Sequence, residues 1–186
     1  MVDRHLNCLG SSGFHRVVYS ERPGPAGAPT LVCVHGLTRN ARDFDTIAEA
    51  LSPHYRVVTP DMPGRGKSQW LTDPSEYSSL YLSDSAALIA RLDVESVDWI
   101  GTSMGGLIGM MLAAQPGSPI RKLVINDIGP LVSKIGLARI RDYVGDPTFP
   151  SIDALEAALR ATYATFGPLT DAQWRKLARD SSREKP

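Results

Sequence analysis

The sequence predicts an α/β fold built on a mostly parallel sheet. Short apolar runs recur between residues 31 and 125, and segments with helical spacing of apolar residues separate them. That alternation is typical of a sheet assembled from strands and crossover helices. The 186 residues, of which 42% are hydrophobic and 22% charged, suffice for one soluble domain that buries its own core.

Four apolar runs are predicted to form the core strands of this sheet, at residues 31–34, 55–59, 97–101 and 123–125. The first run is continuously apolar, which fits a strand buried on both faces. Upstream, residues 17–19 lie between Gly13 and the turn-rich segment 23–25. This arrangement predicts an edge hairpin that leads into the sheet.

Helices are predicted between the strands from the spacing of apolar side chains. One face is marked by Phe44, Ile47 and Leu51, and a second by Leu82, Ala86, Ile89 and Leu92. A third helix begins at Met104 and stops before Pro116.

The chain after residue 130 contains no further strand-like run and is predicted to be helical. Leu137, Ile140 and Val144 line one predicted face, Ser151 is a predicted N-cap, and Thr170 with Gln173 forms a predicted capping box. We therefore divide the chain into an α/β core, residues 1–130, and a helical segment, residues 131–186.

Charge and cysteine content narrow the classes of partner. Twenty basic and twenty acidic residues balance, so we expect a small-molecule ligand and neither nucleic acid nor a membrane surface. Two cysteines, Cys8 and Cys33, are too few for a disulfide framework or a cysteine-based metal site, and Cys33 is expected to be buried. The first ten residues lack a signal-like apolar stretch, and nowhere do about 18 apolar residues run together, so a cytoplasmic location is expected.

The segment from Gly101 to Gly105 reads GxSxG and lies where a predicted strand meets a predicted helix. Such a sharp turn exposes the serine hydroxyl for attack on a carbonyl, and small flanking residues relieve its crowding. Ser103 is therefore the candidate nucleophile, and the Met104 N–H is one candidate oxyanion donor. GxSxG also arises by chance in Gly-rich chains, but the strand before it and the helix after it favour the functional interpretation.

The loop after the first core strand, from His35 through Gly36 to Leu37, is predicted to complete the oxyanion hole. A tetrahedral intermediate needs two converging N–H donors, and the Leu37 N–H is the second candidate. His35 has two interpretations, a general base or a brace that holds the loop. The brace is favoured, because a base there conflicts with the order of the triad along the chain.

The segment Gly64 to Ser68 resembles the end of a phosphate-binding loop, GxxxxGKS. The first glycine of that pattern falls on Asp61, and Pro63 lacks an N–H that would face phosphate. We therefore expect no nucleotide site, and we interpret Lys67 as a solvated side chain.

Residues 31–37, 61–68 and 101–106 together resemble the α/β-hydrolase superfamily, and the resemblance runs from about residue 14 to residue 186. It implies a mostly parallel sheet under a helical cap, here residues 131–186, that shapes the substrate pocket. Asp61, Pro63, Gly64, Gly66 and Ser68 match a structural loop of that family. Cap-bearing esterases, enol-lactonases and carbon–carbon bond hydrolases share these motifs.

The triad of this fold runs Ser, acid, His along the chain, whereas His5, His15, His35 and His54 all precede Ser103. The base is thus expected outside the 186 residues, and the sequence resembles a truncated hydrolase. Asp127 follows the last predicted strand and has two interpretations. It is either the triad acid or part of a turn into Gly129 and Pro130, and turn chemistry favours the second.

These motifs predict hydrolysis of a small ester or related carbonyl compound through an acyl-serine, with no metal or organic cofactor. The 186 residues alone are expected to be nearly inactive. Two alternatives stay open, a catalytically silent binding protein and a cofactor-independent haloperoxidase or acyltransferase. Missing strands would expose a sheet edge, through which a homo-oligomer could form.

Overall fold

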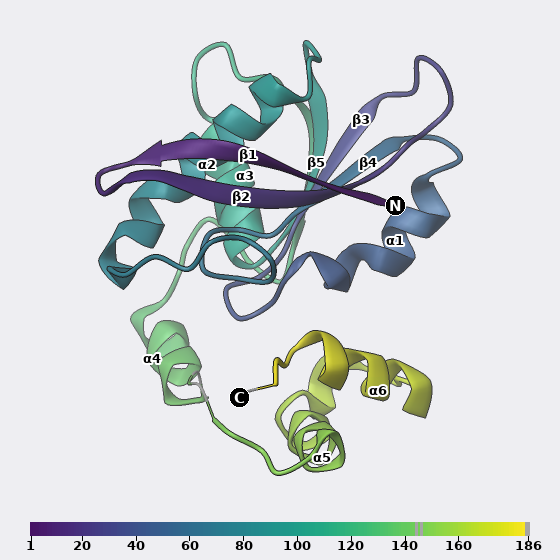
Figure 1. Cartoon of the computed structure of the whole chain (residues 1–186), viewed down its shortest axis with the longest axis vertical. Helices are drawn as coiled ribbons and strands as arrows, with labels where there is room; N and C mark the ends of the chain where they lie inside the picture. The colour runs from purple at the N-terminus through teal and green to yellow at the C-terminus, as the bar shows by residue number, and fades with distance from the viewer. Residues whose placement is uncertain (144, 146, 185–186) are drawn as a thin grey trace. The chain divides into compact units, whose positions relative to one another are not determined.

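A computed structural model describes residues 1–143, 145 and 147–184, in two compact units, Met1–Val132 and Ser133–Pro186. The first unit contains the sheet and three α-helices, and the second is helical (Figure 1). Val144, predicted to extend a helical face, lies outside the described residues.

The six strands of the first unit form one mixed sheet in the order β1-β2-β4-β3-β5-β6. Their bounds are β1 Val2–Gly10, β2 Gly13–Arg22, β3 Thr30–Val34, β4 Arg56–Pro60, β5 Val97–Thr102 and β6 Ile120–Asn126. Strands β3 to β6 pair in parallel, while β1 and β2 form an antiparallel hairpin that joins β4 through β2. The predicted mostly parallel sheet is confirmed, and so is a hairpin at its edge, of which the sequence patterns indicated residues 17–19 but not the bounds of β1.

Helices cover both faces of the sheet (Figure 1). They are α1 Asp45–Leu51, preceded by the 3-10 turn η1 Ala41–Phe44, α2 Tyr77–Arg91, preceded by η2 Pro74–Glu76, and α3 Met104–Ala113. Alternate residues of β3 point to opposite faces, so Val32 and Val34 join the core under α2 and α3. Leu31 and Cys33 join the core under α1, and all five residues of β3 are buried.

The helix faces differ in detail from those predicted. In α1, Ala48 is buried and Ile47 is 39% exposed, because the short helix rests on the sheet through Phe44 and Ala48, four residues apart. In α2, Ala86 is exposed and Leu82 only partly buried. The buried stripe of α2 instead contains Leu80, Asp84, Ser85, Leu88 and Ile89, and it therefore includes two polar side chains.

Strand β6 was predicted as a core strand, but most of its side chains are exposed. Val124 is 54% and Ile125 is 39% exposed. In the described part of the chain β6 pairs with β5 alone, so it forms one margin of the sheet. An apolar strand at a margin with open backbone groups is a surface on which further chain can pair.

The second unit contains α4 Lys134–Tyr143, α5 Ile152–Thr162, η3 Ala164–Phe166 and α6 Asp171–Asp180. Both predicted caps are confirmed. The Ser151 side chain accepts a hydrogen bond from the Ala154 N–H, and Thr170 and Gln173 form a capping box. Helices α5 and α6 pack together, with Leu155, Trp174 and Ala178 buried. The assignment of this segment as a cap stays a prediction.

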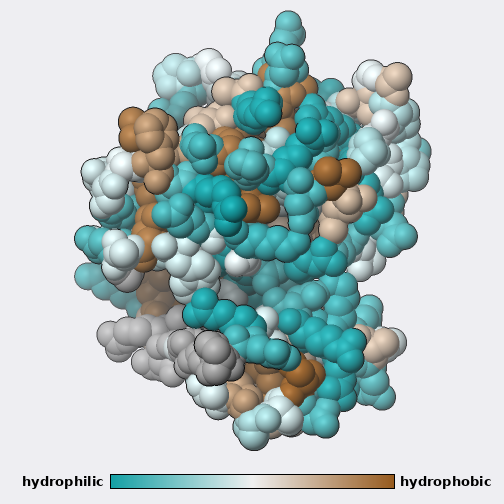
Figure 2. Space-filling view, in the orientation of Figure 1, coloured by the Kyte–Doolittle hydropathy of each residue, from teal (hydrophilic) through white to brown (hydrophobic). Residues whose placement is uncertain are grey.

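Across the described residues, the structure contains no helix with the length and apolar character needed to cross a membrane. On the face shown in Figure 2 hydrophilic side chains predominate, and apolar side chains occur as separate spots.

Candidate active site

Ser103 occupies the turn between the end of β5 and the start of α3. Its φ of 51° and ψ of −111° place it among three non-glycine residues with positive φ in the described chain. A non-glycine residue in this region stores about 1–3 kcal/mol of strain, which only a well-packed surrounding sustains. The strained turn projects the serine from the carboxyl edge of the sheet, where β3, β4 and β6 also end.

Two glycines allow that turn to form. A Cβ on Gly101 would lie 2.2 Å from the Gly105 carbonyl oxygen, and a Cβ on Gly105 would lie 2.1 Å from the Val34 carbonyl oxygen. The indole N–H of Trp99, on β5, donates to the Gly105 carbonyl oxygen at 3.0 Å. The first turn of α3 therefore packs directly on β5 and on the end of β3.

The predicted oxyanion donors are the amides of Leu37, in the loop after β3, and of Met104, in the turn between β5 and α3. Met104 is the first residue of α3, so its N–H has no acceptor within the helix. A Cβ on Gly36 would lie 3.6 Å from the Ser103 Cβ, so the two loops are in van der Waals proximity. The Gly36 carbonyl oxygen accepts from the His35 ring at 2.7 Å and from the Arg39 N–H at 3.1 Å. Because a peptide is planar, these bonds also fix the direction of the Leu37 N–H.

His35 is completely buried, and both ring nitrogens contact backbone. The Met62 N–H donates to Nε2 at 3.0 Å, so the proton is on Nδ1, which donates to the Gly36 carbonyl oxygen. Burial lowers the pKa of His35, which keeps the ring neutral. The ring thus links the loop after β3 to the loop after β4 and has no free nitrogen for the Ser103 proton.

Arg65, which the sequence patterns did not single out, holds the same loop from its other side. Its Nε donates to the Leu37 carbonyl oxygen at 2.9 Å, and its guanidinium also donates to the Tyr81 hydroxyl at 2.8 Å. The guanidinium lies 5.2 Å and 5.6 Å from the centres of the Tyr77 and Tyr81 rings. The sequence signal for this role was a basic residue between two loop glycines, but which groups the side chain contacts depends on the fold.

The loop that carries Arg65 is itself anchored by Asp61. The two oxygens of this carboxylate accept from the Ala41 N–H and the Lys67 N–H, each at 2.8 Å. A Cβ on Gly66 would lie 2.2 Å from the Asp61 carboxyl carbon. The Lys67 side chain is largely exposed and pairs with Asp3. These contacts give the segment a structural role, in which Asp61 holds the loop through backbone amides.

Strand β6 contacts the candidate nucleophile through its last residue. The Ser103 N–H donates to the Asn126 carbonyl oxygen at 2.9 Å. Asp127 follows at once with φ of 57° and an exposed side chain. Left-handed Asp is common in turns, so this backbone agrees with the turn interpretation, while its position beside Ser103 keeps the acid role testable.

The remaining histidines lie elsewhere. His15 is buried against Asp84, and His5 is exposed on β1. His54 precedes β4, at the amino edge of the parallel strands and thus opposite the elbow. None of the four histidines, all of which are described, is placed to take a proton from Ser103.

Comparison with known proteins identifies the family. Residues 29–172 match the model of the alpha/beta hydrolase fold family, which is more than half of the chain. The chain belongs to the α/β hydrolase family. A putative hydrolase from Rickettsia typhi has a similar structure, with a TM-score of 0.89, 31% identity, and coverage of 96% of this chain and 67% of that one.

Two curated relatives of this α/β hydrolase are named as a hydrolase and an esterase. The 3-hydroxybutyrate-oligomer hydrolase of Cupriavidus necator is 51% identical over 174 residues, or 92% of this chain and 59% of the relative. The pimeloyl-[acyl-carrier protein] methyl ester esterase of Pectobacterium carotovorum subsp. carotovorum is 33% identical over 99 residues, or 53% and 36%. The chain therefore spans 59% and 36% of these relatives.

Proposed function

We propose that this α/β hydrolase carries the nucleophile and the oxyanion site of a serine ester hydrolase. Ser103 Oγ attacks the ester carbonyl carbon, and the Leu37 and Met104 amides bind the oxyanion of the tetrahedral intermediate. A general base takes the Ser103 proton and returns it to the alcohol as the ester C–O bond breaks, and water then hydrolyses the acyl-serine to the free acid, with no metal or organic cofactor in the reaction. The strained backbone of Ser103 at the junction of β5 and α3 is the observation that carries the proposal.

The general base in this proposal lies outside the 186 residues, since the four histidines present are bonded elsewhere or are distant from the elbow. Loss of one triad member leaves roughly 10³–10⁴-fold catalysis over water in well-studied proteases. We therefore expect the 186-residue chain alone to hydrolyse activated esters only slowly.

The substrate class we propose is a short oligoester or a simple ester of an aliphatic acid. The support is the name of the 51% identical relative, which acts on 3-hydroxybutyrate oligomers, and of the second relative, which acts on a methyl ester. We also propose that the helical segment from residue 131 onward serves as a cap that shapes the acyl pocket.

The first test uses the natural gene product, its intact mass, and a fluorophosphonate probe with mapping of the modified residue. We expect a single adduct on Ser103 and none in Ser103→Ala. An unlabelled Ser103 in the folded natural product would refute the serine mechanism and favour a silent binding protein. That alternative predicts bound 3-hydroxybutyrate dimer without turnover.

A second test asks whether the 186 residues lack only a base. Imidazole added in solution can accept the Ser103 proton if the elbow and the oxyanion donors are otherwise in place. We expect imidazole to raise p-nitrophenyl butyrate hydrolysis by the chain above the rate with Ser103→Ala, which measures the direct reaction of imidazole. Equal rates for the two proteins would contradict the proposed site.

The role of Asp127 is separable by the same assays on the natural product. If Asp127 belongs only to the turn, Asp127→Asn leaves the labelling rate of Ser103 nearly unchanged. If it is the triad acid, the rate falls by about two to four orders of magnitude.

A further inference from the structure

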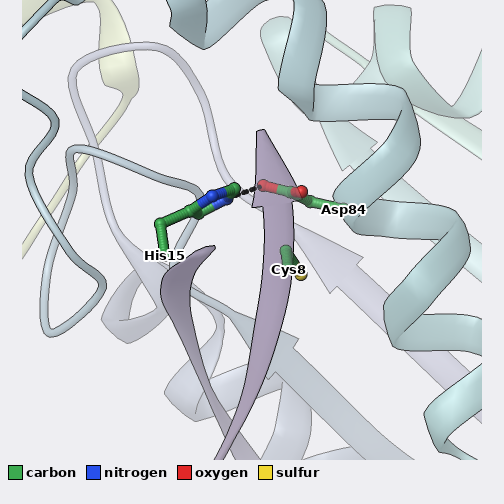
Figure 3. Close-up of side chains that lie close together, drawn as sticks. All are labelled: Cys8, His15 and Asp84. Atoms are coloured by element: carbon green, nitrogen blue, oxygen red, sulfur yellow. Dashed lines mark hydrogen bonds and ion pairs between the residues drawn. The ribbon is translucent and has the colours of Figure 1, made fainter. Parts of the chain in front are cut away.

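A second cluster of reactive side chains lies where the hairpin β1–β2 packs against α2 (Figure 3). Cys8 is on β1 and His15 on β2, and the strand register places them directly opposite each other, so both side chains lie on one face. Asp84 comes from the buried stripe of α2, between Leu80 and Leu88. The exposed fractions of Cys8, His15 and Asp84 are 3%, 3% and 2%.

The carboxylate of Asp84 is incompletely satisfied in this site. One oxygen lies 2.7 Å from His15 Nε2, while the other, Oδ1, is buried and accepts no N–H or O–H among the described residues, so the weakly donating Cys8 thiol is the only further donor beside the carboxylate there. Burial raises the pKa of Asp84, and burial, the nearby Asp84 charge and the hydrogen bond of the thiol to Asp84 raise the pKa of Cys8 to about 12. A buried carboxylate whose second oxygen has at most a weak thiol donor is poorly compensated for the loss of water, so the arrangement requires an explanation.

We propose that Cys8, His15 and Asp84 form a binding site for a divalent transition-metal ion, with Zn²⁺ as the best match. Thiolate, imidazole and carboxylate are the three kinds of side chain that bind zinc in proteins. The three potential ligand atoms lie within 4.8 Å of one another. Zinc bonds of about 2.0–2.3 Å at tetrahedral angles require ligand atoms about 3.3–3.6 Å apart. Side-chain rotations that move the ligand atoms by about an ångström therefore suffice to bring them to zinc-binding distances.

Charge balance supports this assignment. A Zn²⁺ ion bound to the Cys8 thiolate, the Asp84 carboxylate and a neutral His15 ring makes a site with no net charge, which a buried location requires. The Cys8 proton is released to solvent when the metal binds. The ion would also replace the weak thiol contact of Asp84 with a metal–oxygen bond, and it would tie the hairpin to α2.

The chain contains a matched control in Cys33. This second cysteine is also buried, on β3, and burial likewise raises its pKa to about 12. Among the described residues, the group of Cys8, His15 and Asp84 is the one that brings three such ligands together, and Cys33 is not part of it. Cys8→Ser and Cys33→Ser thus remove equivalent buried thiols, of which only one lies in the cluster.

The test titrates the metal-free 186-residue chain with Co²⁺, which occupies zinc sites and gives a near-ultraviolet absorption band when a thiolate binds it. We expect one Co²⁺ per chain, a thiolate band that Zn²⁺ abolishes, loss of the band in Cys8→Ser and its retention in Cys33→Ser. Asp84→Asn should weaken Co²⁺ binding at least tenfold. Zn²⁺ at about one hundred times its Kd should raise the Tm of the wild type and of Cys33→Ser by roughly 5–10 °C.

Far-UV circular dichroism establishes that each variant is folded. Absence of both the band and the Tm shift in folded wild-type protein would overturn the proposal and leave His15 and Asp84 as a hydrogen-bonded pair. A band that persists in Cys8→Ser, or disappears in folded Cys33→Ser, would overturn it as well. If Cys8→Ser does not fold, the comparison of the wild type with Asp84→Asn tests the proposal. Equal Co²⁺ affinity in these two proteins would exclude the site.

Discussion

Gly105→Ala tests the packing of the elbow, because the added methyl group has no space. Its Cβ would lie 2.1 Å from the carbonyl oxygen and 2.6 Å from the carbonyl carbon of Val34. Val34 is fully buried at the end of β3, between two paired strands, so its backbone cannot retreat without disturbing the sheet. Overpacking costs about 1–3 kcal/mol, and a clash with backbone belongs at the upper end.

A gain of about 1 kcal/mol partly offsets that cost, since alanine is the better helix former. The net loss of folding free energy is therefore about 2 kcal/mol, which for a protein of this size lowers Tm by roughly 4–8 °C. Thermal denaturation followed by far-UV circular dichroism measures the shift.

Gly129→Ala provides the control, because no heavy atom lies within 4 Å of its added Cβ and its φ is not positive. Its stability should stay within about 0.5 kcal/mol of the wild type. A Gly105→Ala protein whose Tm lies within about 1 °C of the wild type would show that the elbow does not pack on β3 in this way.

Three further predictions concern the loop, the pH response and the sheet margin. Arg65→Met should lower the rate of Ser103 labelling in the natural product about tenfold or more, because it frees the loop that carries Leu37, the proposed oxyanion donor. Lys67→Met removes an exposed side chain and should leave the labelling rate unchanged. Because the folded state lowers the pKa of His35, the unfolded state binds more protons below about pH 6.5, so the free energy of unfolding falls as the pH drops, by up to about 1.4 kcal/mol per pH unit. Urea unfolding at a series of pH values measures this fall, and His35→Gln should lack the part of it that His35 causes. The chain should self-associate through the β6 margin, where Val124 and Ile125 are exposed. The double variant Val124→Lys and Ile125→Lys should shift the mass measured by light scattering toward that of the monomer, whereas an unchanged mass would locate the contact elsewhere.

The elements that the sequence predicted well are those whose signal is local. Strand β3 is continuously apolar because both of its faces are covered, and the turn at Ser103 follows from a motif whose strand and helix were visible on either side. The caps of α5 and α6 likewise depend on residues three apart. In each case the residues that determine the structure are neighbours in the chain.

What the sequence did not reveal depends on distant residues meeting. Strand β1 has few buried residues, Leu6 and Cys8 among them, so its apolar pattern is weak, and its pairing with β2 gives it a place in the sheet. His15 and Asp84 lie 69 positions apart, although a carboxylate within an apolar stripe was a usable clue. Arg65 acts on a loop 28 positions away, which no local pattern can disclose.

The bond from the Ser103 N–H to Asn126 makes the elbow dependent on a strand at the margin of the sheet, whose side chains are exposed or only partly buried. Strand ends at a margin open and close with little free energy, and each opening of β6 would release Ser103 from its strained turn. We therefore expect the conformation of Ser103 to depend on whatever covers or pairs with β6. Hydrogen exchange at the amides of Ser103 and Asn126 would rise and fall together, and chain that pairs with this margin would slow exchange at the elbow without touching it.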